Sequence, residues 1–223
     1  MKNKIFTLLT LLAICLSSCV TKVPMDPSFY NENKVGVIVQ VDSINRFKEG
    51  AQGLLDMAIS SGAKYKEALS HIGTQVDPEP IFKDAILNKL DKKNKSYIFI
   101  EDKIDLTSFS KFDKPESDSK VKYYAKDLRS LKAKYNVDQL VVINVKYGLT
   151  IGYYSMIETG KGGSSYVTTE VIDLQNNAIL YRDTYVKTVP FRGKWDTPPH
   201  YERLKENIDQ AVSQSVLEFE NKM

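Results

Sequence analysis

Hydrophobic residues recur along this chain with two spacings, one typical of strands and one typical of helices. Dense β-branched runs and apolar–polar alternation predict strands at 34–41, 97–100, 139–151, 164–174 and 179–189. Apolar residues three and four positions apart predict helices at 78–92, at 120–135 and from 201 almost to the C-terminus. The pattern at 120–135 is the most regular of the three, with apolar residues on one side and lysines mainly on the other.

Turn residues indicate how these elements are connected. Gly160, Gly162 and Gly163 predict the turn of a first hairpin, and Gln175-Asn176-Asn177 predicts the turn of a second. Two shorter helical stripes predict a pair of helices in an insertion at 42–76. These helices either cap the core or form a partner-binding surface.

The order of the predicted elements is strand, helices, strand, helix, strand, two linked hairpins and helix. This order predicts an α/β (α+β) fold with a mixed sheet of about five strands and helices packed on it. We expect the C-terminal helix to lie across the sheet, beside the helix at 120–135. The whole of 34–223 is expected to form a single domain.

The N-terminus combines the features of a secretory signal. Two lysines precede an almost unbroken apolar run at 5–16, and Leu16-Ser17-Ser18-Cys19 closes that run. The run is too short for a membrane-spanning helix, which needs roughly 20 residues. The closing tetrapeptide resembles the lipobox of bacterial lipoproteins at all four positions. The resemblance implies that a signal peptide, 1–18, is removed and that Cys19 carries lipid such as palmitate; an ordinary signal cleavage nearby is the alternative.

The residues after Cys19 bear on where such a protein would reside. Val20 stands where an Asp would resemble an inner-membrane retention signal, and no acidic run follows of the kind that resembles a surface-export signal. We therefore expect a protein of the bacterial cell envelope, bound to membrane lipid through acylated Cys19, at the outer membrane and facing the periplasm. The polar segment 19–33, interrupted by Pro24 and Pro27, predicts a tether.

Composition excludes several classes of site. The formal charge of +3 falls to +1 when the two lysines of the signal are removed, so we expect no nucleic-acid surface. Of the two cysteines, Cys15 lies in the signal and Cys19 would carry lipid, which leaves no thiol for a disulfide, a zinc site or a nucleophile. With only His71 and His200, a histidine metal cluster is not expected either. We predict no cofactor and no metal.

Motifs for catalysis are weak. Gly160-Lys161-Gly162-Gly163 departs from the phosphate-loop pattern and precedes a predicted strand, so a hairpin turn is the better interpretation. No serine lies in a nucleophile-elbow pattern. Carboxylates remain as candidates for a carboxylate-dependent envelope hydrolase, but we expect no enzyme. These carboxylates are Glu101, Asp102, Glu170, Asp173 and Asp183.

Aromatic residues are the candidates for partner contact. Trp195, which stands between a strand and a helix, either anchors a partner or fills the core at the helix start. Tyr153 and Tyr154 extend the apolar strand 139–151 and are further candidates. The hairpin at 145–173 offers an alternative, because its apolar face approaches the ~9–11 residues of a membrane strand and oligomers of it could form an outer-membrane pore or secretion component.

Three segments resemble a known α/β module. They are 35–41, 137–142 and 173–182, the last with an Asp, a tight turn and an aliphatic–aromatic pair. The module is shared by the curli-secretion lipoprotein and the outer-membrane activators of penicillin-binding proteins, and the insertion at 42–76 departs from it. The resemblance implies a non-catalytic scaffold that binds an envelope protein partner, and homo-oligomers are a further expectation.

Overall fold

A mixed β-sheet forms the centre of the protein, in a computed structural model that describes residues 22–31, 34–49, 65–115, 120–154 and 157–223. The strand order is β3-β1-β4-β5-β6, and β2 pairs separately with β4. Strands β1, β2 and β3 pair in parallel with their neighbours, whereas β4, β5 and β6 form two antiparallel hairpins. The bounds are β1 (Val35–Val41), β2 (Asn45–Glu49), β3 (Tyr97–Phe99), β4 (Gln139–Tyr154), β5 (Ile157–Asp173) and β6 (Ile179–Pro190).

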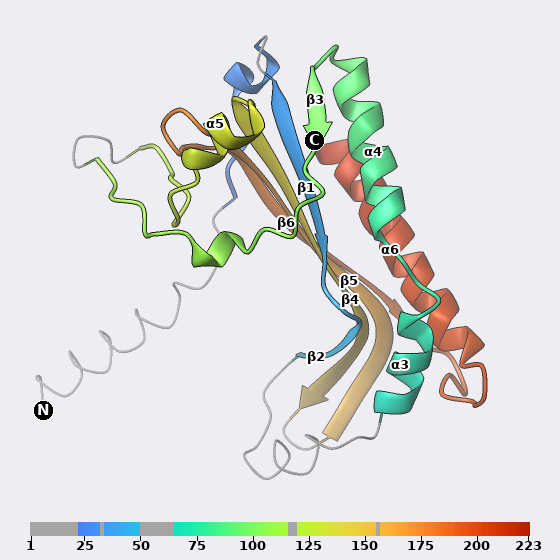
Figure 1. Cartoon of the computed structure of the whole chain (residues 1–223). Coiled ribbons are helices and arrows are strands. Elements are labelled where there is room, and N and C mark those ends of the chain that lie inside the picture. The colour runs from blue at the N-terminus through green and yellow to red at the C-terminus, as the bar shows by residue number, and fades with distance from the viewer. Residues whose placement is uncertain (1–21, 32–33, 50–64, 116–119, 155–156) are drawn as a thin grey trace, which may run out of the picture.

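Helices cover the two faces of this sheet unequally (Figure 1). One face carries α3 (Lys66–Gly73), α4 (Glu79–Lys92) and α6 (Glu202–Lys222). The opposite face carries the short helix α5 (Ser130–Tyr135) and the chain around η2 (Leu106–Ser108). The predicted fold class, a mixed sheet with helices packed on it and a C-terminal helix across it, is confirmed.

The first half of β4 is apolar on both sides because both of its faces are covered. Val141, Ile143 and Val145 pack into the core beneath α4 and α6. Leu140 and Val142 pack with residues of the α5 layer. All five side chains are fully buried, which explains the continuous apolar run in the sequence.

The predicted helix at 120–135 is wrong over most of its length, because only Ser130–Tyr135 is helical. Residues 120–129 form isolated bridges instead, including Lys111 with Lys126 and Tyr123 with Ala178. The expected neighbour of the C-terminal helix is also wrong, since α6 packs beside α4 on the other face of the sheet. The rings of Phe82 and Phe219, 6.2 Å apart, join these two helices.

The glycines expected at the first hairpin turn lie inside a strand. Gly162 pairs with both Thr150 and Pro190, and the β4–β5 connection falls between Tyr154 and Ile157 instead. Gly163 has a packing role, because a Cβ there would lie 2.5 Å from the backbone of Asn207 in α6. Small residues at this point therefore let α6 approach the sheet closely.

The insertion at 42–76 contains an element that the sequence did not predict. Its start forms β2, whose polar sequence has a single large hydrophobic residue, Phe47. The second predicted helix is confirmed as α3, and the first, at 51–59, lies outside the described residues. Part of the segment expected to be a tether is packed on the domain, where η1 (Pro27–Tyr30) buries Phe29.

Candidate functional site

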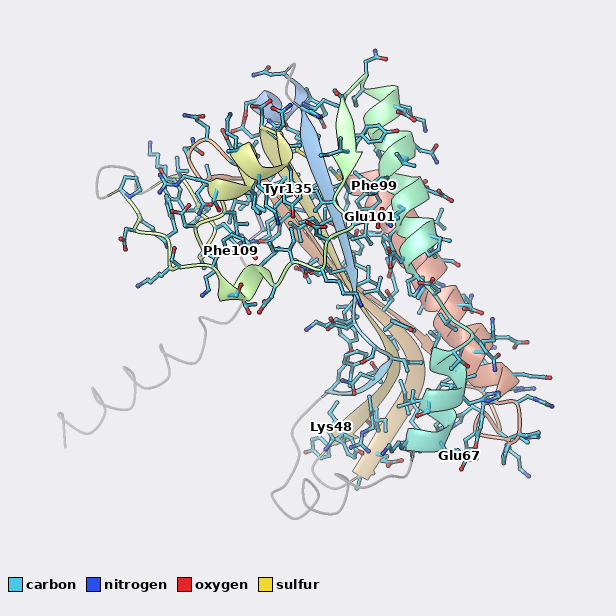
Figure 2. The ribbon with its side chains drawn as sticks, viewed as in Figure 1. Lys48, Glu67, Phe99, Glu101, Phe109 and Tyr135 are labelled. Carbon is cyan, nitrogen blue, oxygen red and sulfur yellow. The ribbon has the colours of Figure 1, made fainter. Side chains whose placement is uncertain are left out.

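The β4–β5 hairpin continues beyond the main core as an arm, which we define as residues 147–154 and 157–165 together with β2. The arm lies at the end of the molecule opposite β3 and α5 (Figure 1). Figure 2 shows Lys48 of β2 and Glu67 of α3 at this end, away from Phe99 and Tyr135. The arm is the part of the sheet that carries the candidate contact residues Tyr153 and Tyr154.

One side of the arm is anchored in the core. Tyr147, Leu149, Ile151 and Tyr153 alternate along β4 and are all buried on the side that carries α3. The hydroxyl of Tyr147 donates a hydrogen bond to the carbonyl oxygen of Val76 at 3.0 Å, which ties the arm to the chain after α3. The arm is therefore a rigid extension of the sheet.

The end of the arm presents two apolar side chains to solvent. Tyr154 and Ile157 are register partners in the β4–β5 ladder and are 75% and 66% exposed. A register shift between Gly152 and Tyr153 precedes them. Tyr153 points inward, so the structure separates the two neighbouring tyrosines, one into the core and one into solvent.

Trp195 lies at the base of the arm, within an aromatic cluster. It is 8% exposed, and its ring stacks on Phe191 with centroids 4.6 Å apart and packs against Tyr65 at 5.4 Å. The ammonium of Lys161, from β5, lies 5.8 Å from the Trp195 ring centroid. Trp195 therefore fills the core beside the start of α6, the second of its two sequence-based interpretations.

The other side of the arm is held by a polar cluster around Tyr166. The Tyr166 hydroxyl donates to a carboxylate oxygen of Glu49 at 2.8 Å and lies 2.9 Å from the hydroxyl of Thr150. The Phe47 ring packs on Tyr166 with centroids 4.6 Å apart. Burial, with a further contribution from Glu49, raises the pKa of Tyr166 to about 12 although Thr150 opposes the shift. These contacts fix β2 against the β4–β5 hairpin.

A second feature is the attachment of the N-terminal segment to β6. Val23 and Arg182 exchange backbone hydrogen bonds of 2.9 and 3.0 Å, and the Asp26 amide donates to Leu180 at 2.8 Å. Lys22 forms an ion pair with Asp183 at 2.9 Å. The sequence did not indicate this attachment, because prolines 24 and 27 favoured a tether. Cys19 itself lies outside the described residues.

The candidate carboxylates do not converge on one site. Glu101 pairs with Lys83, and Asp102 accepts from the Tyr135 hydroxyl at 2.6 Å. The remaining three also have their own partners: Glu170 with Arg182, Asp173 with the amide of Gln175, and Asp183 with Lys22 and Lys222. Glu170 and Asp183 are on opposite faces of the sheet, as their register positions on β5 and β6 require.

The described residues offer neither a metal site nor a membrane-spanning helix. Within that part of the chain, no group of three or more His, Cys, Asp and Glu side chains is placed to hold a metal ion. None of the helices among the described residues is both long enough and apolar enough to cross a bilayer.

Comparison with known proteins gives distant structural neighbours. No family model matches the chain, and no curated protein matches it. The hypothetical protein CT253 from Chlamydia trachomatis is 11% identical, with 86% of this chain and 97% of that chain covered and a TM-score of 0.36. The lipoprotein GNA1162 from Neisseria meningitidis is 10% identical, with 84% and 98% covered and a TM-score of 0.33. A PelC dodecamer from Paraburkholderia phytofirmans is 11% identical, with 86% of this chain and 93% of that chain covered and a TM-score of 0.31.

Proposed function

We propose that this chain is a lipid-anchored protein of the bacterial cell envelope that acts, without catalysis, by binding another envelope protein through the end of its arm. The lipobox at Leu16-Ser17-Ser18-Cys19 supports the anchor. Val20 favours the outer membrane, and the lack of an acidic run directly after Cys19 favours the periplasmic side. The exposed pair Tyr154 and Ile157 supports the binding site.

The pair at the end of the arm is the observation that carries the binding function. Among the residues that the structure describes, Tyr154 and Ile157 are the most exposed large hydrophobic side chains, and they are directly opposite each other. An aromatic and an aliphatic side chain together are typical of the centre of a protein interface. The other exposed large hydrophobic residues each lie on a different element or loop: Tyr30, Ile81, Val121, Val186 and Leu217.

The anchoring of the arm favours binding over a merely exposed loop. Tyr153 and Ile151 hold β4 in the core directly before the pair, and Tyr166 holds the other side of the hairpin to Glu49. A rigid presentation reduces the conformational entropy that is lost on binding. The contact surface is therefore preorganised.

In-cell photo-crosslinking tests the binding site. A photoreactive amino acid at Ile157 is expected to give one adduct of defined mass, whereas the same group at Leu217, 59% exposed on α6, gives none. Adding Tyr154→Ser to the chain that carries the photoreactive amino acid at position 157 is expected to reduce the yield of the adduct at least tenfold. An adduct of twice the chain mass would identify a second copy as the partner. Equal labelling from both positions would contradict the proposal.

Membrane fractionation tests the anchor separately. Cys19→Ser is expected to move the protein from the membrane fraction to the soluble fraction, and the wild-type chain is expected to have the mass of a protein that begins at acylated Cys19. Retention of Cys19→Ser in membranes, with no acyl mass on the wild type, would reject the anchor.

The two alternatives receive less support. A pore built from the hairpin would need an apolar face toward lipid, but Val145, Tyr147, Leu149 and Ile151 are buried in the core of the same chain. A carboxylate-dependent hydrolase would need acids that share a cavity, and the candidate acids are separated by the sheet or each bound to a partner of its own.

A further inference from the structure

We propose that the outer edge of β6 faces the headgroup layer of the membrane that holds the lipid anchor. The inference rests on the proposed acylation of Cys19 and adds an orientation to it. The occupant of this edge is therefore a lipid surface, because only a short length of chain separates Cys19 from the first fixed residue.

The chain is fixed to β6 as soon as it enters the described part of the structure. Lys22 pairs with Asp183, whose side chain is only 7% exposed, and Val23 exchanges two backbone hydrogen bonds with Arg182. A paired backbone and an ion pair with a buried carboxylate hold this point to the sheet edge.

Only Val20 and Thr21 separate Cys19 from this fixed point. Three Cα–Cα steps span at most roughly 11 Å even when fully extended. The headgroup layer on each side of a bilayer is itself about 5–7 Å thick. Lys22 and the β6 edge beside it must then lie against or close to the headgroups, and the domain has no room to tumble freely.

The sheet face next to this edge presents side chains that suit a polar lipid surface. Thr184, Val186 and Thr188 alternate along β6 on the face away from α6 and are exposed. Two carboxylates of β5 and β6 are compensated, since Glu170 is paired with Arg182 at 2.6 Å and Asp183 with Lys22 and Lys222. The exposed Asp26, at the same edge, accepts a hydrogen bond from the amide of Ser28. A surface of hydroxyls and one aliphatic group, without uncompensated acids on β6, avoids repulsion from anionic headgroups.

The orientation has a consequence for the arm. With the long edge of β6 against the membrane, the strands run along the bilayer plane rather than perpendicular to it. The arm, which continues β4 and β5, then points along the membrane surface. Tyr154 and Ile157 are presented to a protein held on the same membrane.

Fluorescence quenching measures the orientation. The mature chain has no cysteine other than Cys19, so a single Cys at Val186 or at Ile81 can be labelled selectively. The two positions are matched, at 45% and 40% exposed, but Ile81 lies on α4, which packs over β1, three strand spacings or roughly 14 Å from β6 across the sheet. In phosphatidylethanolamine–phosphatidylglycerol vesicles with headgroup-quencher lipid, we expect at least threefold stronger quenching from 186 than from 81.

A lengthened tether provides the second measurement. Inserting about twelve Gly and Ser residues between Val20 and Thr21 adds roughly 20 Å of mean reach and is expected to remove the difference between the two positions. Equal quenching of acylated protein without the insertion would overturn the orientation alone. A difference that persists with the insertion would overturn the tether as its cause. Absence of acyl chains by mass spectrometry would overturn the anchor and the orientation together.

Discussion

The ammonium of Lys95 lies 2.6 Å from the backbone carbonyl oxygen of Phe29, inside the protein. Lys95 is 6% exposed, and it also donates to the carbonyl of Asn31 at 2.7 Å and to the side chain of Gln139 at 3.3 Å. Burial lowers the pKa of Lys95, although Asp138 opposes the shift. One side chain thus joins the N-terminal segment to the start of β4 and fixes that segment on the domain.

Replacing Lys95 is therefore expected to release the N-terminal segment. Lys95→Met keeps the apolar stem but leaves the carbonyls of Phe29 and Asn31 without this donor, at a cost of about 2–3 kcal/mol in the free energy of unfolding. Limited proteolysis followed by mass spectrometry is expected to show faster cleavage within 22–31. Lys93→Met, at an exposed position over the Tyr30 ring, is the control and changes the unfolding free energy by less than about 0.5 kcal/mol. Equal effects of the two variants would contradict the role of Lys95.

The pairing of β2 with β4 inside the arm depends on Gly148. Its backbone φ is 146°, and a Cβ there would lie 1.9 Å from the carbonyl oxygen of Asn45. Gly148→Ala is expected to lower the free energy of unfolding by at least about 2 kcal/mol, because strain and a backbone clash combine. Gly160→Ala, in the same hairpin but with open space around its Cβ, is expected to be neutral within about 0.5 kcal/mol. Denaturant titration of both variants measures the difference, and similar values would reject the close approach.

Sequence patterns predicted the strands well because a strand buried on one face has alternating apolar residues and a strand buried on both faces has a continuous apolar run. β4 was predicted from Leu140–Ile143 and the alternation that follows, and the structure buries those residues as expected. The predicted helix at 120–135 does not form over 120–129 because the backbone groups of these residues make hydrogen bonds to distant segments of the chain. Tyr124 donates its amide to the carbonyl of Asn177, and Ala125 accepts from Phe112. Apolar spacing does not record such long-range partners.

The candidate site was predictable only in part for a similar reason. Tyr154 was named from the sequence, but alternation alone does not say which face of a strand is covered. The role of Trp195 depends on Phe191 and Tyr65, and Tyr65 is far from it in the chain. β2 carries too few apolar residues to be recognised, although its Glu49 and Phe47 hold Tyr166 in place.

Tyr166 is expected to give the arm a specific alkaline sensitivity. Its pKa is about 12 in the folded protein against the ordinary tyrosine pKa of 10.0, so between these values the folded state retains a proton that the unfolded state loses. The resulting stabilisation is complete below pH 10 and is lost as the pH rises from 10 to 12. Tyr166→Phe removes this component, so its unfolding free energy falls less steeply over that range than that of the wild type.

Ultraviolet titration of tyrosinate absorbance checks the assignment. The difference between the wild type and Tyr166→Phe is expected to show one group that titrates near pH 12. Glu49→Gln is expected to lower the pKa of Tyr166 while the hydroxyl keeps an acceptor, since the carboxylate contributes to the upward shift. A difference titration centred at pH 10 would reject the buried environment.

Asn177 is expected to be a sensitive position outside the apolar core, because its side chain binds the backbone of residues 124–128 in place of the helix that the sequence pattern favours. Its side chain accepts from the Leu128 amide at 3.0 Å and donates to the carbonyls of Tyr124 and Lys126, at 3.0 and 2.9 Å. It is fully buried and has a φ of 67°, in the left-handed region that Asn tolerates.

Two substitutions at Asn177 separate the backbone from the side chain. Asn177→Gly keeps the left-handed conformation and loses the three hydrogen bonds, with an expected loss of about 2–3 kcal/mol in the free energy of unfolding. Asn177→Ala adds about 1 kcal/mol of backbone strain. Asn176→Ala, which removes one bond to the Ala178 amide at the same turn, costs about 1 kcal/mol or less. Circular dichroism is expected to show a gain of helix in the Asn177 variants as residues 120–129 lose their partners; unchanged stability in Asn177→Gly would refute this role of the side chain.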